Sequence, residues 1–255
     1  ALFPDADSNE LQCRSAFATL DYSYFIAANS KRFGQTPLVR LCDDGAYRLT
    51  DEFRSMLEQT TFRTFFTDTV EAGLFNALAL AESSRKHHIR QNHGFLYGEK
   101  YSVFDVMRLC GWPAEQVPQN VGGYKLDTET GSLPIFIKYE ASQYGDRFLN
   151  PGEIEWFSKN NRSLKSNEFR WLLDGTERTP EWQNRHFVPI FIRRKAEEQE
   201  KSYYFVGNAV ALDDVRASVN PGEDGSESKV VISTLKLGKP VDPELYRHLT
   251  GKSAL

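Results

Sequence analysis

The spacing of apolar residues changes near residue 98, and this change constrains the fold more than any other feature of the sequence. Before it, the segments 8–34 and 50–84 repeat apolar residues every three or four positions, which is typical of amphipathic helices. After it, three runs are rich in β-branched and aromatic residues, a composition typical of strands. These runs are 186–195, 202–212 and 229–241. We therefore predict an α+β protein, with a helical segment over 1–98 and a strand-rich domain over 99–255.

Cap and turn residues mark short elements in the second part of the chain. Ser102 begins a capping pattern for a helix that ends at Gly111, and Asp242 followed by Pro243 predicts a last helix. Gly131 can supply the positive φ of a turn between two strands. Five or more antiparallel strands decorated by short helices predict a small, strongly curved sheet or barrel.

The composition excludes several classes of protein. The chain has 255 residues, of which 40% are hydrophobic and 13% aromatic, so it can bury a full core. A net charge of −4 excludes a wholesale polycation but allows a local basic patch. No apolar run approaches the length of a membrane-spanning helix and no leader is present, so we expect a cytoplasmic protein. The first residues, from Ala1, look like a chain already under way, and we expect a fragment of a longer protein.

Catalytic chemistry is not visible in the sequence. The three widely spaced cysteines are interpreted as small buried hydrophobic residues and not as a disulfide framework or a zinc site. The adjacent histidines His87 and His88 point in different directions on a helix, and no carboxylate-rich motif accompanies them. Phosphate-binding and nucleophile motifs are absent from the sequence. We therefore expect a binding domain without enzymatic activity, cofactor or metal.

Two segments are candidates for binding. Residues 117–127 combine Asn120 with the pair Gly122 and Gly123, which would let a backbone approach a ligand closely, although a glycine bulge that leads into a hairpin explains the same residues. Residues 144–166 combine aromatic, acidic and basic side chains, and their last part is either a phosphate-contacting loop or a solvated one.

Within the second segment, Asn150 followed by Pro151 predicts a short helix or turn that presents Trp156. Asp146 and Arg147 have two interpretations. They either form an ion pair that pins a corner of the fold, or Asp146 is a carboxylate that accepts a hydrogen bond from a ligand.

Four motifs between residues 96 and 166 resemble a known family. They are "LYGEKYSVFDVMRLCGW", "VPQNVGGYKLD", "LPIFIKYE" and "YGDRFLNPGEIEWFSKNNRSLKS". In this order and spacing they are similar to the C-terminal domain-of-unknown-function family that follows superfamily-two helicase cores in bacterial proteins. In the methylation-dependent type IV restriction enzymes of that family, the domain is similar to the SET-and-RING-associated (SRA) fold, a PUA-like barrel that reads modified cytosine.

The resemblance implies a curved barrel that binds double-stranded DNA and rotates a modified cytosine out of the duplex. The base would stack between aromatic rings while polar and basic loops hold the phosphates. By their chemistry, the candidates for the base pocket are Tyr124, Tyr139, Tyr144, Asp146 and Trp156. The candidates for other DNA contacts are Asn120, Lys125, Arg147, Ser158, Lys159, Arg162 and Lys165.

These observations predict a DNA-binding specificity module of a larger helicase or restriction protein, which recognises 5-methylcytosine or 5-hydroxymethylcytosine. Helicase and nuclease domains of the parent protein would be its partners. The alternative is an interaction module, in which the helical segment forms a homodimer of the parent and the barrel only stiffens the assembly.

Overall fold

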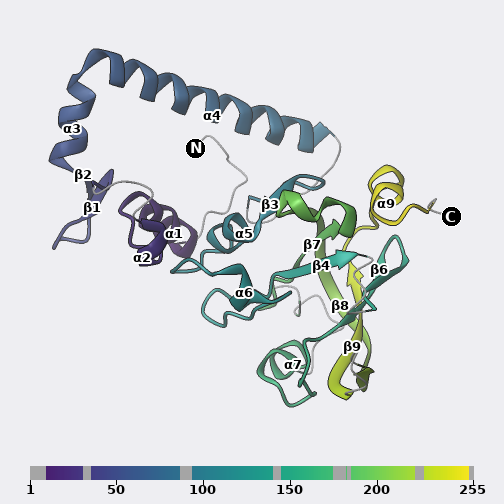
Figure 1. Ribbon diagram of the computed structural model, residues 1–255. Coiled ribbons are helices and arrows are strands. Elements are labelled where there is room, and N and C mark those ends of the chain that lie inside the picture. Colours follow the sequence, from purple (N-terminus) through teal and green to yellow (C-terminus); the bar gives the residue numbers. More distant parts are fainter. Residues whose placement is uncertain are drawn as a thin grey trace. The chain divides into compact units, whose positions relative to one another are not determined.

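The computed structural model shows two compact units (Figure 1). One comprises residues 1–97 and 104–116, and the other comprises residues 98–103 and 117–255. The residues that the structure describes are 10–30, 36–86, 94–139, 145–174, 182, 185–221 and 227–252, without the side chains of 80–86. None of the described helices has the length and apolar character needed to cross a membrane.

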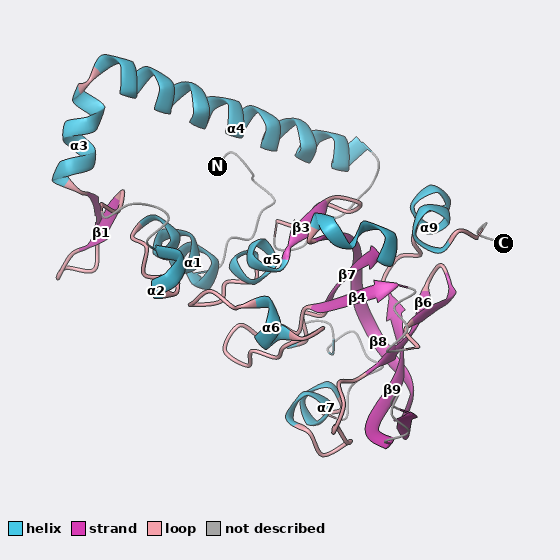
Figure 2. Ribbon diagram, viewed as in Figure 1, coloured by secondary structure: helices cyan, strands magenta, loops and turns pink. Residues whose placement is uncertain are grey.

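The first unit contains helices and one small hairpin (Figure 2). Its elements are α1 (Glu10–Leu20), α2 (Ala27–Ser30), β1 (Val39–Leu41), β2 (Tyr47–Leu49), α3 (Asp51–Glu58), α4 (Thr60–Lys86) and α5 (Val103–Leu109), the last beginning at the boundary with the second unit. The Thr50 hydroxyl accepts from the backbone N–H of Phe53 and caps α3. The rings of Phe62 and Phe66 lie 6.1 and 5.3 Å from the ring of Phe53, which joins α3 to α4.

The β1–β2 hairpin corrects the prediction that residues before 98 are only helical. Its turn contains Asp44 and Gly45, a residue pair typical of tight hairpins. Gly45 has φ of 78° and donates its N–H to the carbonyl of Cys42 at 2.9 Å. The strands are only three residues long, too short for an alternating pattern to stand out in the sequence.

The second unit is built on a seven-stranded sheet. Its strands are β3 (Lys100–Ser102), β4 (Ile135–Tyr139), β5 (Arg147–Asn150), β6 (Glu153–Phe157), β7 (Pro189–Arg194), β8 (Ser202–Pro221) and β9 (Glu227–Leu237). The strand order is β4-β7-β8-β9-β6-β5, with β3 paired to β8, and every pair except β4–β7 is antiparallel. The helices are α6 (Pro118–Val121), α7 (Asn167–Leu172), the 3₁₀ helix η2 (Lys195–Glu200) and α9 (Pro243–Thr250).

The sheet curls until its two end strands touch. Tyr139 of β4 and Phe148 of β5 have ring centroids 6.0 Å apart, although β4 and β5 lie at opposite ends of the strand order. Tyr246 of α9 packs on Phe148 at 5.2 Å. The long strand β8 permits the curl because its pairing with β9 is interrupted by two bulges, one of which contains Asp214 with φ of 49°. The predicted α+β class, with N-terminal helices followed by a strongly curved sheet, is confirmed.

The segment around Asn150 is a turn between two strands and not the start of a helix. The Asn150 side chain accepts from the backbone N–H of Gly152 at 2.9 Å, which links β5 directly to β6. Trp156 therefore lies on a strand and alternates inward together with Ile154. By contrast, the predicted last helix is confirmed as α9: Asp242 caps it through the N–H groups of Glu244 and Leu245.

A buried aromatic group forms the core at the closed side of the sheet. Trp156 is 2% exposed, and its ring lies 5.0 Å from that of Tyr124 and 5.8 Å from that of Phe169. Tyr124 forms a bridge with Ile135 of β4, while Phe169 belongs to α7. Trp156 therefore connects β6 to the opposite end of the sheet and to a covering helix.

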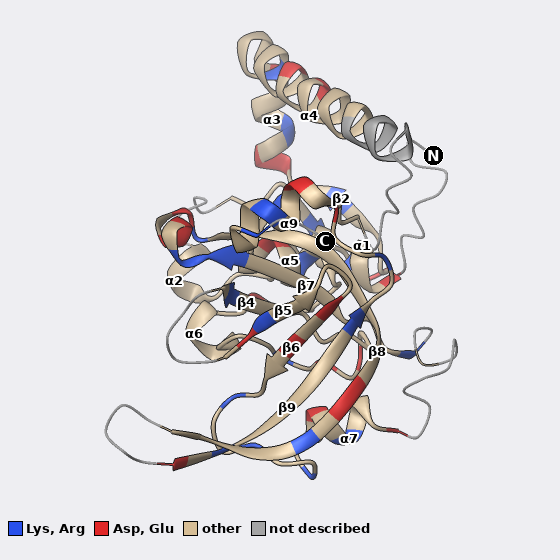
Figure 3. Cartoon of the chain, turned by 90° about the vertical axis from the view of Figure 1, so that its right-hand side faces the viewer, with Lys and Arg blue, Asp and Glu red and all other residues tan. Residues whose placement is uncertain are grey.

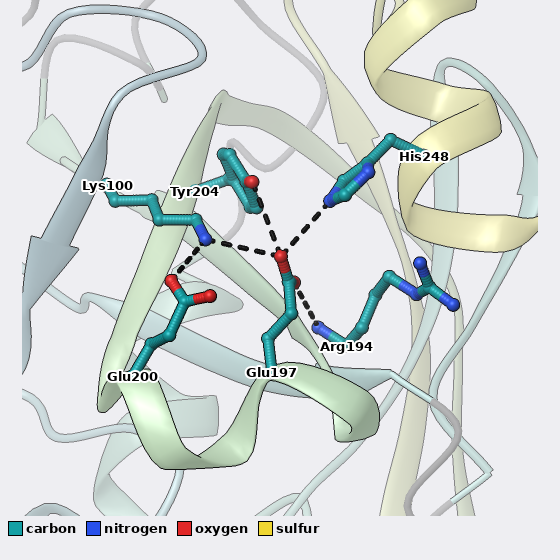
Figure 4. Close-up of polar contacts among 6 residues, drawn as sticks. All are labelled: Lys100, Arg194, Glu197, Glu200, Tyr204 and His248. Atoms are coloured by element: carbon teal, nitrogen blue, oxygen red, sulfur yellow. Dashed lines mark hydrogen bonds and ion pairs between the residues drawn. The ribbon is translucent and has the colours of Figure 1, made fainter.

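A polar network attaches α9 to the sheet (Figure 4). One oxygen of Glu197 lies 3.2 Å from the ammonium of Lys100, 3.2 Å from Nε2 of His248 and 3.4 Å from the hydroxyl of Tyr204. Its other oxygen accepts from the backbone N–H of Arg194. These groups come from β3, α9, β8 and the end of β7, so one carboxylate joins four elements.

We predict that Glu197→Gln lowers the free energy of unfolding by about 1–2 kcal/mol at neutral pH, because an amide cannot replace the charged contacts. Desolvation raises the pKa of Glu197. Hydrogen bonds from Lys100 and His248 together lower it by a larger amount, so the pKa of Glu197 is lowered overall. The contribution is therefore present at neutral pH and lost as the pH falls through this pKa. Denaturant titrations at several pH values should show the difference shrinking on acidification.

The exposed Glu198, paired with Lys138, provides the control. Glu198→Gln should change the free energy of unfolding little, and equal effects of the two variants would refute the importance of the network.

We also predict that Trp156→Ala costs on the order of 3–5 kcal/mol, because it leaves a large cavity between β6 and α7. Denaturant unfolding followed by circular dichroism measures this cost. Leu149→Ala, on the neighbouring strand β5 and 46% exposed, should cost less than about 1 kcal/mol. A Trp156→Ala protein that unfolds at the same denaturant concentration as its parent would show that the ring is not part of the core.

Candidate functional site

Asp146 lies immediately before β5, at the C-terminal end of β6. Its Oδ1 accepts from the backbone N–H of Phe157 at 2.8 Å, and this is its one hydrogen bond to the described residues. Gly145 holds the corner tightly, because a Cβ there would lie 3.0 Å from the ring of Phe157. The side chain is thus fixed with one oxygen engaged and the other without a described partner.

The pKa of Asp146 is raised to about 7. Burial is the main cause, the Phe157 N–H opposes it, and the nearby charge of Glu155 raises the pKa further. The predicted ion pair between Asp146 and Arg147 does not form. Arg147 instead binds Glu155 at 2.9 Å, because Asp146, one position earlier, is on the opposite side of the chain. Asp146 is therefore a carboxyl group that changes protonation near neutral pH.

A second group lies just beyond the same end of β6 and centres on Glu168 of α7. Glu168 accepts from the hydroxyl of Tyr124 at 2.9 Å and pairs with Nε of Arg162 at 2.9 Å. The Tyr124 hydroxyl also accepts from the backbone N–H of Lys159 at 3.3 Å. Burial and the charge of Glu168 raise the pKa of Tyr124, so the phenol stays protonated and acts as a donor. These contacts fix the loop between β6 and α7.

Lys159 is half-buried and lacks a counter-charge in direct contact. Its ammonium lies 4.5 Å from the centre of the Tyr124 ring. No carboxylate among the described residues lies within 4.0 Å of it. Burial lowers the pKa of Lys159, and the charges of Arg162 and Lys125 lower it further, while Glu168 acts in the opposite direction. Lys159 and Arg162 beside the single carboxylate of Glu168 leave a surplus of positive charge, which favours an anion at this place.

The other face of the same strands is electrically balanced. Glu155 pairs with Arg147 and Arg216, and Lys236 pairs with Glu153 and Asp213. Figure 3 shows both blue and red segments on this group of strands. These paired charges contrast with the surplus positive charge at the end of β6.

Several predicted site residues are structural. Ser158 is fully buried, and its hydroxyl accepts from the backbone N–H of Val231 at 2.8 Å, so it ties β6 to β9 and cannot contact a phosphate. Tyr124, Tyr139 and Trp156 are 4%, 7% and 2% exposed and present no free ring face. Their apolar surface closes the sheet, which is the physical reason that they are not open stacking platforms. Tyr144 lies outside the described residues.

The remaining predicted contacts lie near the surface. Asn120 is exposed on α6, Lys125 is half-buried, and Lys165 is exposed in the loop after β6. Gly122 and Gly123 have φ of 51° and 94°. Gly122 is the C-cap of α6, and Gly123 leads into the pairing with β4, where its carbonyl accepts from the backbone N–H of Phe136.

Glu168 and Phe157 were not identified from the sequence. Glu168 occupies the first turn of a short helix, where an acidic residue is ordinary. Its contact with Tyr124 spans 44 positions, and the sequence carries no signal for that pairing. Phe157 contributes through its backbone, which no side-chain pattern can reveal.

Comparison with known structures gives distant similarities. The DNA recognition domain of the cytosine modification-dependent restriction endonuclease LpnPI is 12% identical, covering 62% of this chain and 89% of that chain, with a TM-score of 0.38. The SUVH5 SRA domain in complex with hemi-methylated CG DNA is 11% identical, covering 57% and 91%, with a TM-score of 0.36. The sulfur binding domain and SRA domain of ScoMcrA, complexed with phosphorothioated DNA, is 14% identical, covering 83% and 69%, with a TM-score of 0.31. At TM-scores below 0.5, these similarities assign no role to any residue of this chain.

Two protein-family models match parts of the chain. No curated protein sequence matches the chain. The model of a "Domain of unknown function (DUF8090)" matches residues 4–81. The model of a "Domain of unknown function (DUF3427)" matches residues 95–249, which is more than half of the chain and includes the whole curved sheet. The chain therefore belongs to the family described as Domain of unknown function (DUF3427).

Proposed function

We propose that this chain is a cytoplasmic DNA-binding module that recognises modified cytosine and belongs to a larger helicase or restriction protein. One observation carries the proposal. A half-buried lysine without a carboxylate partner among the described residues, Lys159, lies at the same end of β6 as the half-buried carboxyl group of Asp146. The lysine ammonium can bind a phosphate, and the carboxyl group can form a hydrogen bond with the edge of a base.

The cations would bind the DNA backbone. Lys159 and Arg162 are held in place by Tyr124 and Glu168, so little side-chain freedom is lost when a phosphate binds. A phosphate between them would neutralise the surplus charge and release counterions. Lys125 and the exposed Lys165 would extend this contact along the strand. Such contacts provide affinity without sequence information.

Asp146 would provide the choice of base. A carboxylate accepts a hydrogen bond from the cytosine amino group, whereas the carbonyl of thymine offers no donor at that position. In a duplex the amino group is already paired with the opposite base, so the carboxylate can accept from it only after the base has left the stack, at a cost of a few kcal/mol. Tyr124 and Trp156 are already packed against each other. We therefore propose that Tyr124 and Trp156 support the site from the core and do not stack on the base.

The direct test of the function is a binding titration. Duplexes that carry 5-methylcytosine, 5-hydroxymethylcytosine, phosphorothioate or no modification are compared at one salt concentration. We expect the cytosine-modified duplexes to bind at least tenfold more tightly than the plain duplex. Equal affinity for all four would refute modified-base recognition and leave only a general DNA contact.

We predict that Lys159→Met weakens binding to modified and plain duplexes by similar factors and reduces the salt slope by about 1, because one phosphate contact is lost. Fluorescence anisotropy between about 50 and 200 mM salt measures both quantities. Lys138→Met is the matched control, because Lys138 lies on β4 and is paired with Glu198 of η2. Unchanged affinity and slope in Lys159→Met would place the DNA-binding surface elsewhere.

We predict that Asp146→Asn weakens binding to the modified duplex by about 1–3 kcal/mol, because it removes the acceptor for the amino group of the flipped cytosine, and leaves plain-duplex binding, in which no base is flipped, within about twofold. The asparagine can still accept from Phe157, so the fold should persist. In the parent protein, affinity for modified DNA should fall as the pH drops through about 7, because the protonated carboxyl no longer accepts on both oxygens. The variant should bind independently of pH between about 6 and 8.

The stability of the same variant provides a check of the carboxyl group itself. A carboxyl with a raised pKa binds its proton more tightly in the folded state, so the parent protein loses stability as the pH rises through about 7. Asp146→Asn removes this loss and should be at least as stable as the parent at pH values above 7. Greater destabilisation at high pH than at low pH would show that Asp146 is a structural anion.

A further inference from the structure

Helix α4 in the first unit carries the main group of exposed apolar side chains in the described part of the chain. The exposed fractions are 68% for Phe65, 43% for Val70, 38% for Leu74, 72% for Phe75 and 36% for Leu78. The ring contacts with Phe53 of α3 come from Phe62 and Phe66, at the beginning of α4. Apolar residues on more than one side of a helix are typical of a helix that other elements enclose.

The uncovered surface is large enough for an interface. Aromatic side chains have roughly 150–250 Å² of surface each, so Phe65 and Phe75 alone leave on the order of 200–350 Å² in contact with water. With Val70, Leu74 and Leu78 added, α4 reaches the size of the largest apolar patch on a typical monomer, about 300–600 Å². Two such helices together would bury close to the roughly 1,000 Å² that a stable interface needs.

The charges along α4 favour a second copy of the same helix. Residues 72–81 contain no charged side chain. The preceding residues 67–71 carry Asp68 and Glu71, whereas the following residues 82–86 carry Glu82, Arg85 and Lys86. The two flanks therefore have opposite net charge. An antiparallel pair places the acidic flank of one helix beside the basic flank of the other, and a parallel pair places like flanks together.

Gly73 fits the same arrangement. A glycine weakens the middle of a helix, and among the described residues no atom outside the adjoining turns of α4 lies within 4 Å of the place where its Cβ would be. Its missing side chain leaves room for a residue of a second helix to approach the backbone. The phenylalanines are concentrated at the beginning of α4 and the alanines at its end, so antiparallel pairing also sets large residues against small ones.

We propose that α4 forms an antiparallel pair with α4 of a second copy of this chain. The uncharged segments lie side by side in this pair, with backbone position 68 of each copy opposite position 85 of the other. This self-association is independent of the proposed DNA binding, because no residue at the end of β6 takes part in it.

The first experiment is sedimentation velocity of the 255-residue chain between about 1 and 100 µM. We expect a dimer. Phe75→Glu with Leu78→Glu should raise the dimer dissociation constant at least tenfold, while Thr64→Glu, a charge added at an exposed polar position of the same helix, should leave it within twofold. Circular dichroism confirms that the helix persists. A monomer at all concentrations, or a dimer that is indifferent to the double substitution, would overturn the proposal.

The second experiment determines the direction of the pair. Asp68→Arg should weaken the dimer severalfold by placing two cations together, and Arg85→Asp in the same chain should restore it. The two positions are about 25 Å apart along one helix at 1.5 Å per residue. Restoration therefore reports a contact between copies and supports the antiparallel pair. Failure of the second substitution to restore the dimer would refute the antiparallel arrangement.

Discussion

The contact between Tyr124 and Glu168 is the interaction on which the rest of the candidate site depends. Glu168 is only 9% exposed, and it would be costly to bury without the Tyr124 hydroxyl and the Arg162 side chain as partners. Removing one partner of a buried charge leaves the other uncompensated, at a cost of about 3–5 kcal/mol. The contact joins α7 to the segment before β4, and Tyr124 in turn holds the backbone of Lys159. The positions of the cations thus follow from one buried carboxylate.

Regular patterns in the sequence predict the architecture well. The β-branched runs become β7, β8 and β9, and the cap residues of α9 act as predicted, because both signals are local. Asn150 followed by Pro151 shows the limit of local signals. An asparagine side chain that accepts a backbone N–H caps a helix and closes a turn with similar geometry, so the pattern alone does not distinguish the two. The structure has the turn, and it places Trp156 on a strand that faces the core instead of presenting it at the surface.

The site could be predicted only in part, because its functional groups are brought together by the curl of the sheet. The sequence identifies Asp146, Lys159 and Arg162 as chemically suitable, and the structure places all three near one end of β6. Aromatic residues are harder to assign from sequence, since a ring that closes a barrel and a ring that stacks on a base have the same composition. Burial decides between them, and burial is a property of the closed sheet.

The arrangement separates affinity from selectivity. A chain with a net charge of −4 can attract DNA only where its charge is locally unbalanced, and the ion pairs of Glu155 and Lys236 neutralise the neighbouring face. Contacts from Lys159 and Arg162 would then be equal for every duplex, because phosphates are the same in every sequence. Discrimination must therefore come from a group that senses the base. Asp146 has the required property. Its carboxyl group is desolvated, so a hydrogen bond to it contributes more to the binding free energy than the same bond would in water. The burial that raises its pKa is thus the same property that would make it selective.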